Sequence, residues 1–156
     1  MPLDIDVILA AIDGVIAKIE KPYSLETVER LVCHELNIPI TNKALLRGDG
    51  FAIAFIYSSG ESFSGVVASI KTIISLDETP ILICMIRPQV IDYTLANTTF
   101  IDKVSHSSKN LTLVKLVGSC LRSNILKNYR GISNERSNFN ALFALHLAAD
   151  RTANLV

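Results

Sequence analysis

Tryptophan is absent from this chain of 156 residues, and aromatic residues of all kinds make up only 6% of it. Charged residues are also few, at 19%, whereas 49% of the residues are apolar. That balance excludes an intrinsically disordered chain. The core must be built mainly from Ile, Leu and Val, and a chain of this length can bury such a core without a metal or a disulfide.

Cysteine is scarce, with three residues that lie far apart at positions 33, 84 and 120. An odd, dispersed set excludes the disulfide framework of small secreted proteins, so we expect reduced, buried thiols. No candidate metal ligand has the short paired spacing of a zinc site, and we predict neither a metal site nor a cofactor in this chain. The ligands considered are Cys33, His34, Cys84, His106, Cys120 and His146. His146 continues an apolar helical stripe, which predicts a packed, hydrogen-bonded histidine.

Long hydrophobic runs are missing as well. Charged residues interrupt the apolar N-terminal stretch, and no run of about 18 uncharged apolar residues exists that could span a bilayer. The N-terminus also lacks the basic region of a signal peptide. We therefore expect a cytoplasmic protein with no membrane partner.

Net charge is zero but unevenly distributed. Residues 1–100 hold 7 Lys and Arg against 12 Asp and Glu (net −5), and residues 101–156 hold 8 against 3 (net +5). Two interpretations stay open: the basic half attracts phosphates, or it pairs with the acidic half. The basic residues concerned are Lys103, Lys109, Lys115, Arg122, Lys127, Arg130 and Arg136.

Hydrophobic periodicity predicts the helices of the N-terminal part. Apolar residues at helical spacing predict an amphipathic helix over residues 4–20, ended by Pro22. Ser24 is placed to cap a second helix that runs to about Leu36. The two helices form a hairpin whose apolar face needs a sheet to cover it.

Short apolar runs bounded by turn residues predict strands over residues 51–57, 81–86, 90–94 and 111–117. Helical spacing over residues 63–74 predicts a helix linking the first two strands, and residues 139–149 predict a final helix. We predict one α+β domain over residues 1–156. Its helical hairpin (1–47) packs on a small mixed β-sheet with a βαβ unit (48–118), and a polar segment with a C-terminal helix (119–156) follows.

Two catalytic motifs are incomplete, so we predict no catalytic residue in this chain. Gly60–Gly65 resembles the strand-to-helix turn on which hydrolases mount a serine, here Ser62, but Ser64 stands where that motif needs a glycine. A hydrolase with Asp77 or Asp92 and His106 is thus the weakest hypothesis. No Asp or Glu is followed two residues later by Lys, so the Glu-x-Lys motif of metal-dependent nucleases is absent.

The remaining candidate is the segment 97–130, in which short hydrogen-bonding side chains alternate with basic ones. Asn97, Thr98 and Thr99 begin this set. Such a mixture suits contacts to phosphates, with Arg or Asn available for base edges, although Ser and Asn are common in any turn. The predicted DNA-binding residues are Lys103, Ser105, His106, Ser107, Lys109, Arg122 and Asn124.

The stretch LANTTFIDKVSHSSKNL (95–111), with Val117-Gly118-Ser119 and the run 138–146, resembles the N-terminal part of type II restriction endonucleases that cut within GGCC. The resemblance covers about residues 81–156. It departs from the family at residues 118–123, where a run like Gly-Ser-Phe-Asn-Gly-Ser is replaced by GSCLRS. No position here matches the family's catalytic residues.

The resemblance implies a restriction-modification protein about twice this length, with an Mg²⁺-dependent nuclease core beyond Val156. This chain would then be a non-catalytic recognition lobe that contacts double-stranded DNA, with a nuclease domain or a second subunit, including a homodimer mate, as partner. The alternative is a structural or protein–protein interaction domain with no role in nucleic-acid binding.

Overall fold

A helical hairpin opens the chain. The computed structural model describes residues 4–60, 62–101, 113–116 and 125–149, beginning with helices α1 (Ile5–Ile16) and α2 (Leu25–Glu35). Asp4 caps α1 by accepting from the N–H of Asp6, and Ser24 caps α2 by accepting from the N–H of Thr27. The two helices contact each other, as the predicted hairpin requires.

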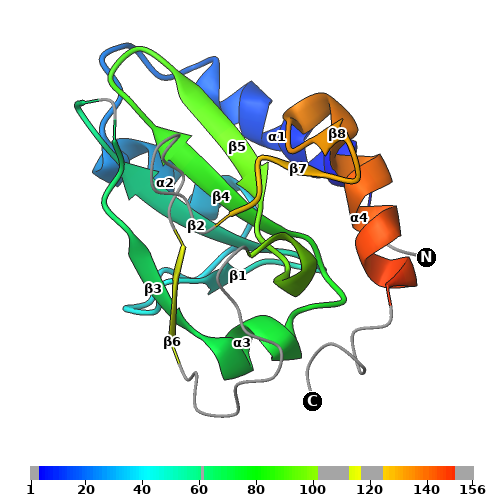
Figure 1. Ribbon diagram of the computed structural model, residues 1–156. Helices are drawn as coiled ribbons and strands as arrows, with labels where there is room; N and C mark the ends of the chain where they lie inside the picture. The colour runs from blue at the N-terminus through cyan, green and yellow to red at the C-terminus, as the bar shows by residue number, and fades with distance from the viewer. Residues whose placement is uncertain (1–3, 61, 102–112, 117–124, 150–156) are drawn as a thin grey trace.

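A four-stranded mixed sheet follows, with strand order β1-β2-β4-β5 (Figure 1). β1 is Leu46–Arg47, β2 is Ala52–Tyr57, β4 is Ile81–Ile86 and β5 is Ile91–Leu95. β2 and β4 run parallel, and the two outer strands run antiparallel to their neighbours. The parallel pair is almost wholly buried, which is why its sequence reads as a continuous apolar run. β1 was not predicted.

The crossover between β2 and β4 corrects the predicted helix over residues 63–74. It holds a strand, β3 (Val66–Ser69), before a short helix, α3 (Ile70–Ser75). β3 pairs antiparallel with β6 (Leu113–Leu116). The local spacing of apolar residues fitted a helix, but Val66 and Val67 are β-branched and take a strand when a distant partner supplies the hydrogen bonds.

The C-terminal part holds further elements. A 3₁₀ turn, η1 (Thr98–Phe100), follows β5, and the hairpin of β7 (Asn128–Tyr129) and β8 (Ile132–Ser133) lies in the segment predicted only as polar. Arg130 and Gly131 both have positive φ, as the two central residues of a tight hairpin turn require. A second turn, η2 (Arg136–Asn138), leads into α4 (Phe139–Ala148), the predicted final helix.

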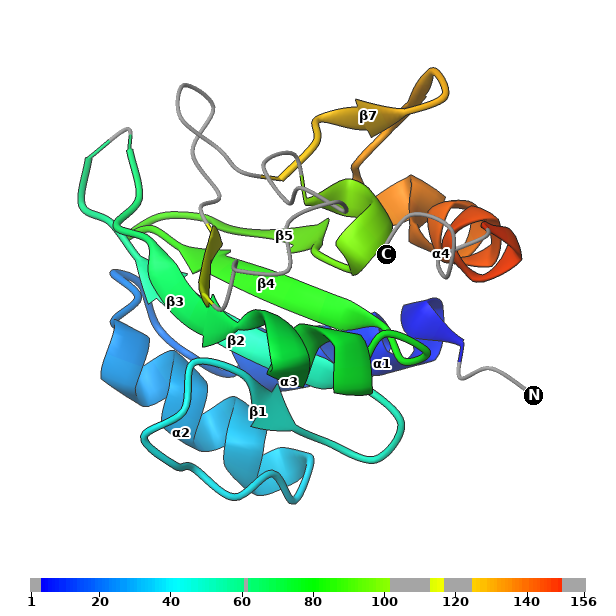
Figure 2. The same cartoon turned by 60° about the horizontal axis from the view of Figure 1, so that its bottom comes forward.

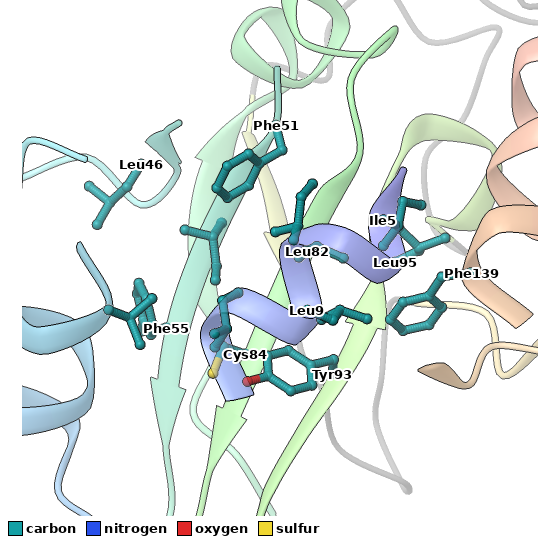
Figure 3. Packing of buried hydrophobic residues seen from close by; sticks show 14 of the residues in the cluster. Ile5, Leu9, Leu46, Phe51, Phe55, Leu82, Cys84, Tyr93, Leu95 and Phe139 are labelled. Atoms are coloured by element: carbon teal, nitrogen blue, oxygen red, sulfur yellow. The ribbon is translucent and has the colours of Figure 1, made fainter. Parts of the chain in front are cut away.

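Two apolar clusters cover the two faces of the four-stranded sheet. Ile53, Phe55, Leu82 and Cys84 belong to the cluster that includes α1, α2 and α4. Figure 3 shows α1 crossing this face, with Leu9 beside Phe139 and the Tyr93 hydroxyl directed at the Cys84 sulfur. The alternate residues of β2 and β4 belong to the second cluster, with α3, β3 and β6, and Figure 2 shows α3 in front of the sheet.

The predicted fold class is therefore confirmed: an N-terminal helical hairpin packs on a small mixed sheet that contains a βαβ unit, and a C-terminal helix completes the fold. Within the described part of the chain, none of the helices has the length and apolar character needed to cross a membrane.

Candidate functional site

The seven predicted DNA-binding residues lie outside the residues that the structure describes. They are Lys103, Ser105, His106, Ser107, Lys109, Arg122 and Asn124. The chain on either side of them is described. Ile101 and Ile125 form an antiparallel bridge, and the N–H of Leu126 donates to the carbonyl oxygen of Phe100 at 2.7 Å. Residues 101 and 125, which flank the segment 102–124, thus lie side by side, and β6 lies within that segment.

A buried polar network lies next to that place, centred on Asp77 in the turn after α3. The exposed fractions of Asp77, Asn97, Thr98 and His146 are 3%, 0%, 1% and 0%. The N–H of Thr98 donates to Asp77 Oδ1 at 3.0 Å, and the Thr98 hydroxyl donates to Asp77 Oδ2 at 2.7 Å. Both carboxylate oxygens are therefore held by η1.

His146 joins α4 to the same carboxylate. Its Nε2 lies 2.8 Å from the carbonyl oxygen of Asp77 and 3.1 Å from Asp77 Oδ1. Because both neighbours are acceptors, Nε2 must carry a proton. The Nδ1 atom lies 2.7 Å from the hydroxyl oxygen of the half-buried Thr99. The prediction that His146 is packed and hydrogen-bonded is confirmed, and the rings of Phe100 and Phe143 lie against it.

Burial raises the pKa of the Asp77 carboxyl, but the hydrogen bonds from His146 and Thr98 outweigh burial, and the net pKa lies below its usual value. Asp77 is therefore an ionised acceptor near neutral pH. A buried carboxylate is tolerated only when its lone pairs are satisfied, and three donors meet that requirement here.

The prediction that the side chains of Asn97 and Thr98 suit phosphate contacts is wrong. Asn97 Nδ2 donates to the carbonyl oxygens of Thr79 (2.7 Å) and Asp77 (3.1 Å), and its Oδ1 accepts from the N–H of Ile81 (3.2 Å). Both side chains are buried and bonded within the fold. Asn97 satisfies backbone groups of the turn before β4, and the Thr98 hydroxyl donates to the Asp77 carboxylate.

The order Asp77, His146, Thr99 is the carboxylate–imidazole–hydroxyl order of a nucleophile relay. Only Thr99 at its end is partly exposed, whereas the imidazole and the carboxylate are closed from solvent. The same contacts tie three segments together: the turn after α3, η1 and α4. The geometry supports a clamp that holds the chain in place immediately before residue 102.

The serine-hydrolase hypothesis loses its structural context. Ser62 is exposed, but the chain after it enters β3 rather than a helix, so the strand-to-helix turn that this motif requires is not formed. The hydrolase histidine considered, His106, lies outside the described residues, and Asp77 is bonded to His146 instead.

Of the seven basic residues singled out in the C-terminal half, four are described, and all four are exposed. Arg136 forms a two-bonded ion pair with Asp13 of α1. Lys115 lies on β6, with its aliphatic stem over Gly65. Lys127 and Arg130 lie beside and within the β7–β8 hairpin. Arg136 thus shows the pairing with the acidic half that was one of the two open interpretations.

Cys33 and Cys84 are buried free thiols, as predicted, and Cys120 lies outside the described residues. Burial and the nearby Glu29 carboxylate raise the pKa of Cys33 to about 11, and burial raises the pKa of Cys84 further. Raised pKa values are typical of inert packing thiols rather than nucleophiles. Among the described residues, no three His, Cys, Asp or Glu side chains gather closely enough to hold a metal ion.

Comparisons of this chain with protein-family models, with curated proteins and with solved structures find no match.

Proposed function

We propose that this chain is a non-catalytic N-terminal lobe of a type II restriction endonuclease-like protein and that it contacts double-stranded DNA. The contacts are assigned to Lys103, Ser105, His106, Ser107, Lys109, Arg122 and Asn124. Cleavage, with the Mg²⁺ that such enzymes use, is assigned to a partner nuclease domain or second subunit, because the Glu-x-Lys motif is missing here. A cytoplasmic location is part of the same proposal.

One observation carries the proposal. The resemblance rests on separate stretches, and two of them, residues 97–99 and His146, meet in the buried network around Asp77. Stretches that carry one family resemblance are expected to contact each other in the fold when they have a common structural role. Here the role is to hold the chain at Phe100 and Ile101, where the predicted DNA-contacting segment begins.

The charge distribution supports the same proposal. The segment 102–124 holds Lys103, Lys109, Lys115 and Arg122 against a single acidic residue, Asp102. Cationic side chains on a segment anchored at both ends would meet phosphates without the entropy cost of ordering the whole chain. Anchoring by Asp77 and by the Ile101–Ile125 bridge would supply that order.

The test is binding of the purified chain to a labelled duplex that contains GGCC and to a scrambled duplex, over a series of salt concentrations. We expect affinity that falls steeply with salt, because phosphate contacts release counterions. Lys109→Glu with Arg122→Glu should abolish binding. Preference for the GGCC duplex would support the family resemblance itself.

The matched control reverses two exposed lysines of the N-terminal half, Lys18→Glu with Lys43→Glu, which changes net charge by the same amount. This control should retain most of the affinity. An equal loss of DNA affinity in both double variants would show that binding depends on net charge alone and not on Lys109 and Arg122. Absence of binding to either duplex at low salt would reject the DNA-contacting role of this chain.

A second candidate is a partner-binding domain without a DNA role, and the outer face of the β3–β6 pair favours it. Val67 and Leu113 are 53% and 58% exposed there, on the same face as Lys115. Contiguous exposed apolar surface marks interaction sites, and Val67 and Leu113 are diagonal neighbours across the strand pair. If this candidate holds, sedimentation shows self-association that Val67→Ser with Leu113→Ser removes, and neither duplex binds.

A further inference from the structure

Strand β5 forms one edge of the four-stranded sheet, and it pairs only with β4 among the described strands (Figure 1). In an antiparallel pair, alternate residues direct their N–H and C=O groups away from the partner strand. Leu95 directs both of its groups outward, because they bond to the side chain of Asn134. By the same alternation, Tyr93 and Ile91 also direct their backbone groups outward.

Asn134 shows what this edge can accept. Its amide accepts from the N–H of Leu95 at 3.0 Å and donates to the carbonyl oxygen of Leu95 at 3.0 Å. This is the pair of bonds that a residue of a neighbouring strand would make. A side chain therefore occupies the place of a fifth strand at Leu95, and the same place beside Tyr93 and Ile91 holds no hydrogen-bonding partner from the described residues.

A pocket of about 390 Å³ lies along the unoccupied part of the edge. Its walls come from Met85, Ile91, Asp92 and Tyr93 of the sheet and from Asn134, Glu135 and Arg136. The space thus has the backbone edge on one side and the chain after β8 on the other. An extended peptide segment is the shape that such a slot accommodates.

The charges of the pocket select among occupants. Asp92 and Glu135 are exposed carboxylates at its wall, and the cation there, Arg136, is paired with Asp13 and lies over the Tyr93 ring. Among the described residues, the charge at the pocket that no ion pair neutralises is therefore negative. A strand laid against β5 would place one of its side chains directly opposite Asp92, where a Lys or Arg forms a favourable cross-strand pair.

A second copy of this chain fits less well. If two β5 strands paired through Ile91 and Tyr93, Asp92 would oppose Asp92 across the narrow, non-hydrogen-bonded position, and like charges there are unfavourable. Shifting the pairing towards Leu95 would require the Asn134 bonds to break. The edge is thus suited to a different strand rather than to its own copy.

We propose that the β5 edge between Ile91 and Tyr93 is a docking site for an extended segment of a partner protein that joins the sheet as an added strand and carries a Lys or Arg opposite Asp92. The residues of this docking site are not among the predicted DNA-contacting residues, and the proposal holds whether or not the chain binds DNA. It supplies a specific place for the partner subunit or domain considered above.

The probe is the synthetic pentapeptide acetyl-Thr-Val-Lys-Val-Thr-amide, titrated into the isotope-labelled chain and followed by NMR. We expect shifts at the amides of Ile91, Asp92 and Tyr93 and at Asn134 and Glu135, together with slower hydrogen exchange at Ile91 and Tyr93. Replacing the central Lys of the peptide with Glu should weaken binding roughly fivefold, the size expected for reversal of one cross-strand charge pair.

Two controls separate strand addition from charge attraction. The same peptide with N-methylated valines cannot donate to the edge and should not bind. Asp92→Lys should reverse the preference, so that the Glu peptide binds better, whereas Asp49→Lys, an exposed change elsewhere, should leave the preference unchanged. Three results would each overturn the proposal. The peptide causes no shifts up to its solubility limit, or the peptide with N-methylated valines causes the same shifts. The third is that raising the protein concentration alone shifts Ile91 and Tyr93.

Discussion

The two ends of strand β5 are completed in opposite ways. At the C-terminal end, Asn134 satisfies the outward backbone groups of Leu95, and the following residues Asn97 and Thr98 bond to the turn after α3. At the N-terminal end, Ile91 and Tyr93 face a pocket. The first end is closed by polar side chains from distant segments, whereas no described residue bonds to the outward backbone groups of the second.

Within one strand, the end at Leu95 thus contributes to the stability of the fold, and the end at Ile91 and Tyr93 is the one proposed for binding. Where the fold must hold one geometry, buried polar groups are satisfied by side chains brought from η1, α4 and the chain after β8. Such networks hold a unique arrangement when they are complete. At the other end, the outward backbone groups of Ile91 and Tyr93 have no hydrogen-bonding partner among the described residues. Four measurements test this difference between the two ends.

The largest effect is expected from removing the centre of the closed end. Asp77→Ala leaves the N–H and hydroxyl of Thr98 and the imidazole of His146 without their acceptor. Each buried donor left without an acceptor costs about 1–3 kcal/mol, so the free energy of unfolding should fall by about 3–5 kcal/mol. Urea denaturation measures it. Asp49→Ala, which is exposed, should stay within about 0.5 kcal/mol of the unaltered chain. A loss below that of a surface change would show that the network contributes nothing.

Acid should weaken the same end. Burial raises the pKa of Asp77, but hydrogen bonds from His146 and Thr98 bring it below its usual value. A carboxyl whose pKa is lowered by folding contributes stability above its unfolded-state pKa, about 3.9, and loses it as the pH falls through the folded-state value. The difference in unfolding free energy between the unaltered chain and Asp77→Asn should thus be constant from pH 7 to 5 and shrink below pH 4. A constant difference down to pH 2 would contradict this assignment.

A smaller effect is expected where the closed and open ends meet. Asn134→Ala removes bonds to both backbone groups of Leu95 and to the carbonyl oxygen of Leu126. Because Asn134 is only half-buried and water can replace it, we expect a loss of about 1–2 kcal/mol. Hydrogen exchange at the Leu95 amide should become as fast as at Tyr93. The exposed Asn42→Ala serves as control, and continued protection of Leu95 would show that Asn134 does not close this edge.

The smallest effect is expected from the exposed ion pair beside the pocket. The side chains of Arg136 and Asp13 are 43% and 47% exposed, so solvent screens their attraction. Asp13→Ala should cost about 0.2–1 kcal/mol in low salt and less in high salt, again by urea denaturation. A loss as large as that of Asp77→Ala would mean that exposure does not distinguish the two pairs.

The sequence predicted the elements whose apolar pattern depends only on near neighbours. The helix expected over residues 4–20 is α1 (Ile5–Ile16), Ser24 caps α2, and the run 81–86 is β4. The helix expected over residues 63–74 was half wrong, because β3 is decided by pairing with β6 beyond residue 112. The β7–β8 hairpin was missed because its signal is one glycine, Gly131, between two short strands.

The candidate site divides in the same way. Periodicity alone placed His146 on the packed face of its helix, and composition marked the segment after Leu95 as polar. No spacing in the sequence predicts that Asp77, Asn97 and His146 meet, because they come from three separate segments. Asn97 and Thr98 were predicted to suit phosphate contacts because free side chains of that type can make them. Burial against the turn after α3 gives them different partners.

The class of the fold and the aliphatic core follow from the amino-acid sequence alone, because hydrophobic patterning acts through the regular geometry of helices and strands. Which polar groups bond to each other depends instead on how distant segments pack. A hydrogen bond requires two atoms about 3 Å apart, and that proximity between distant segments is a property of the folded chain alone. The closed network at Asp77 and the open edge at Tyr93 are both of this second kind.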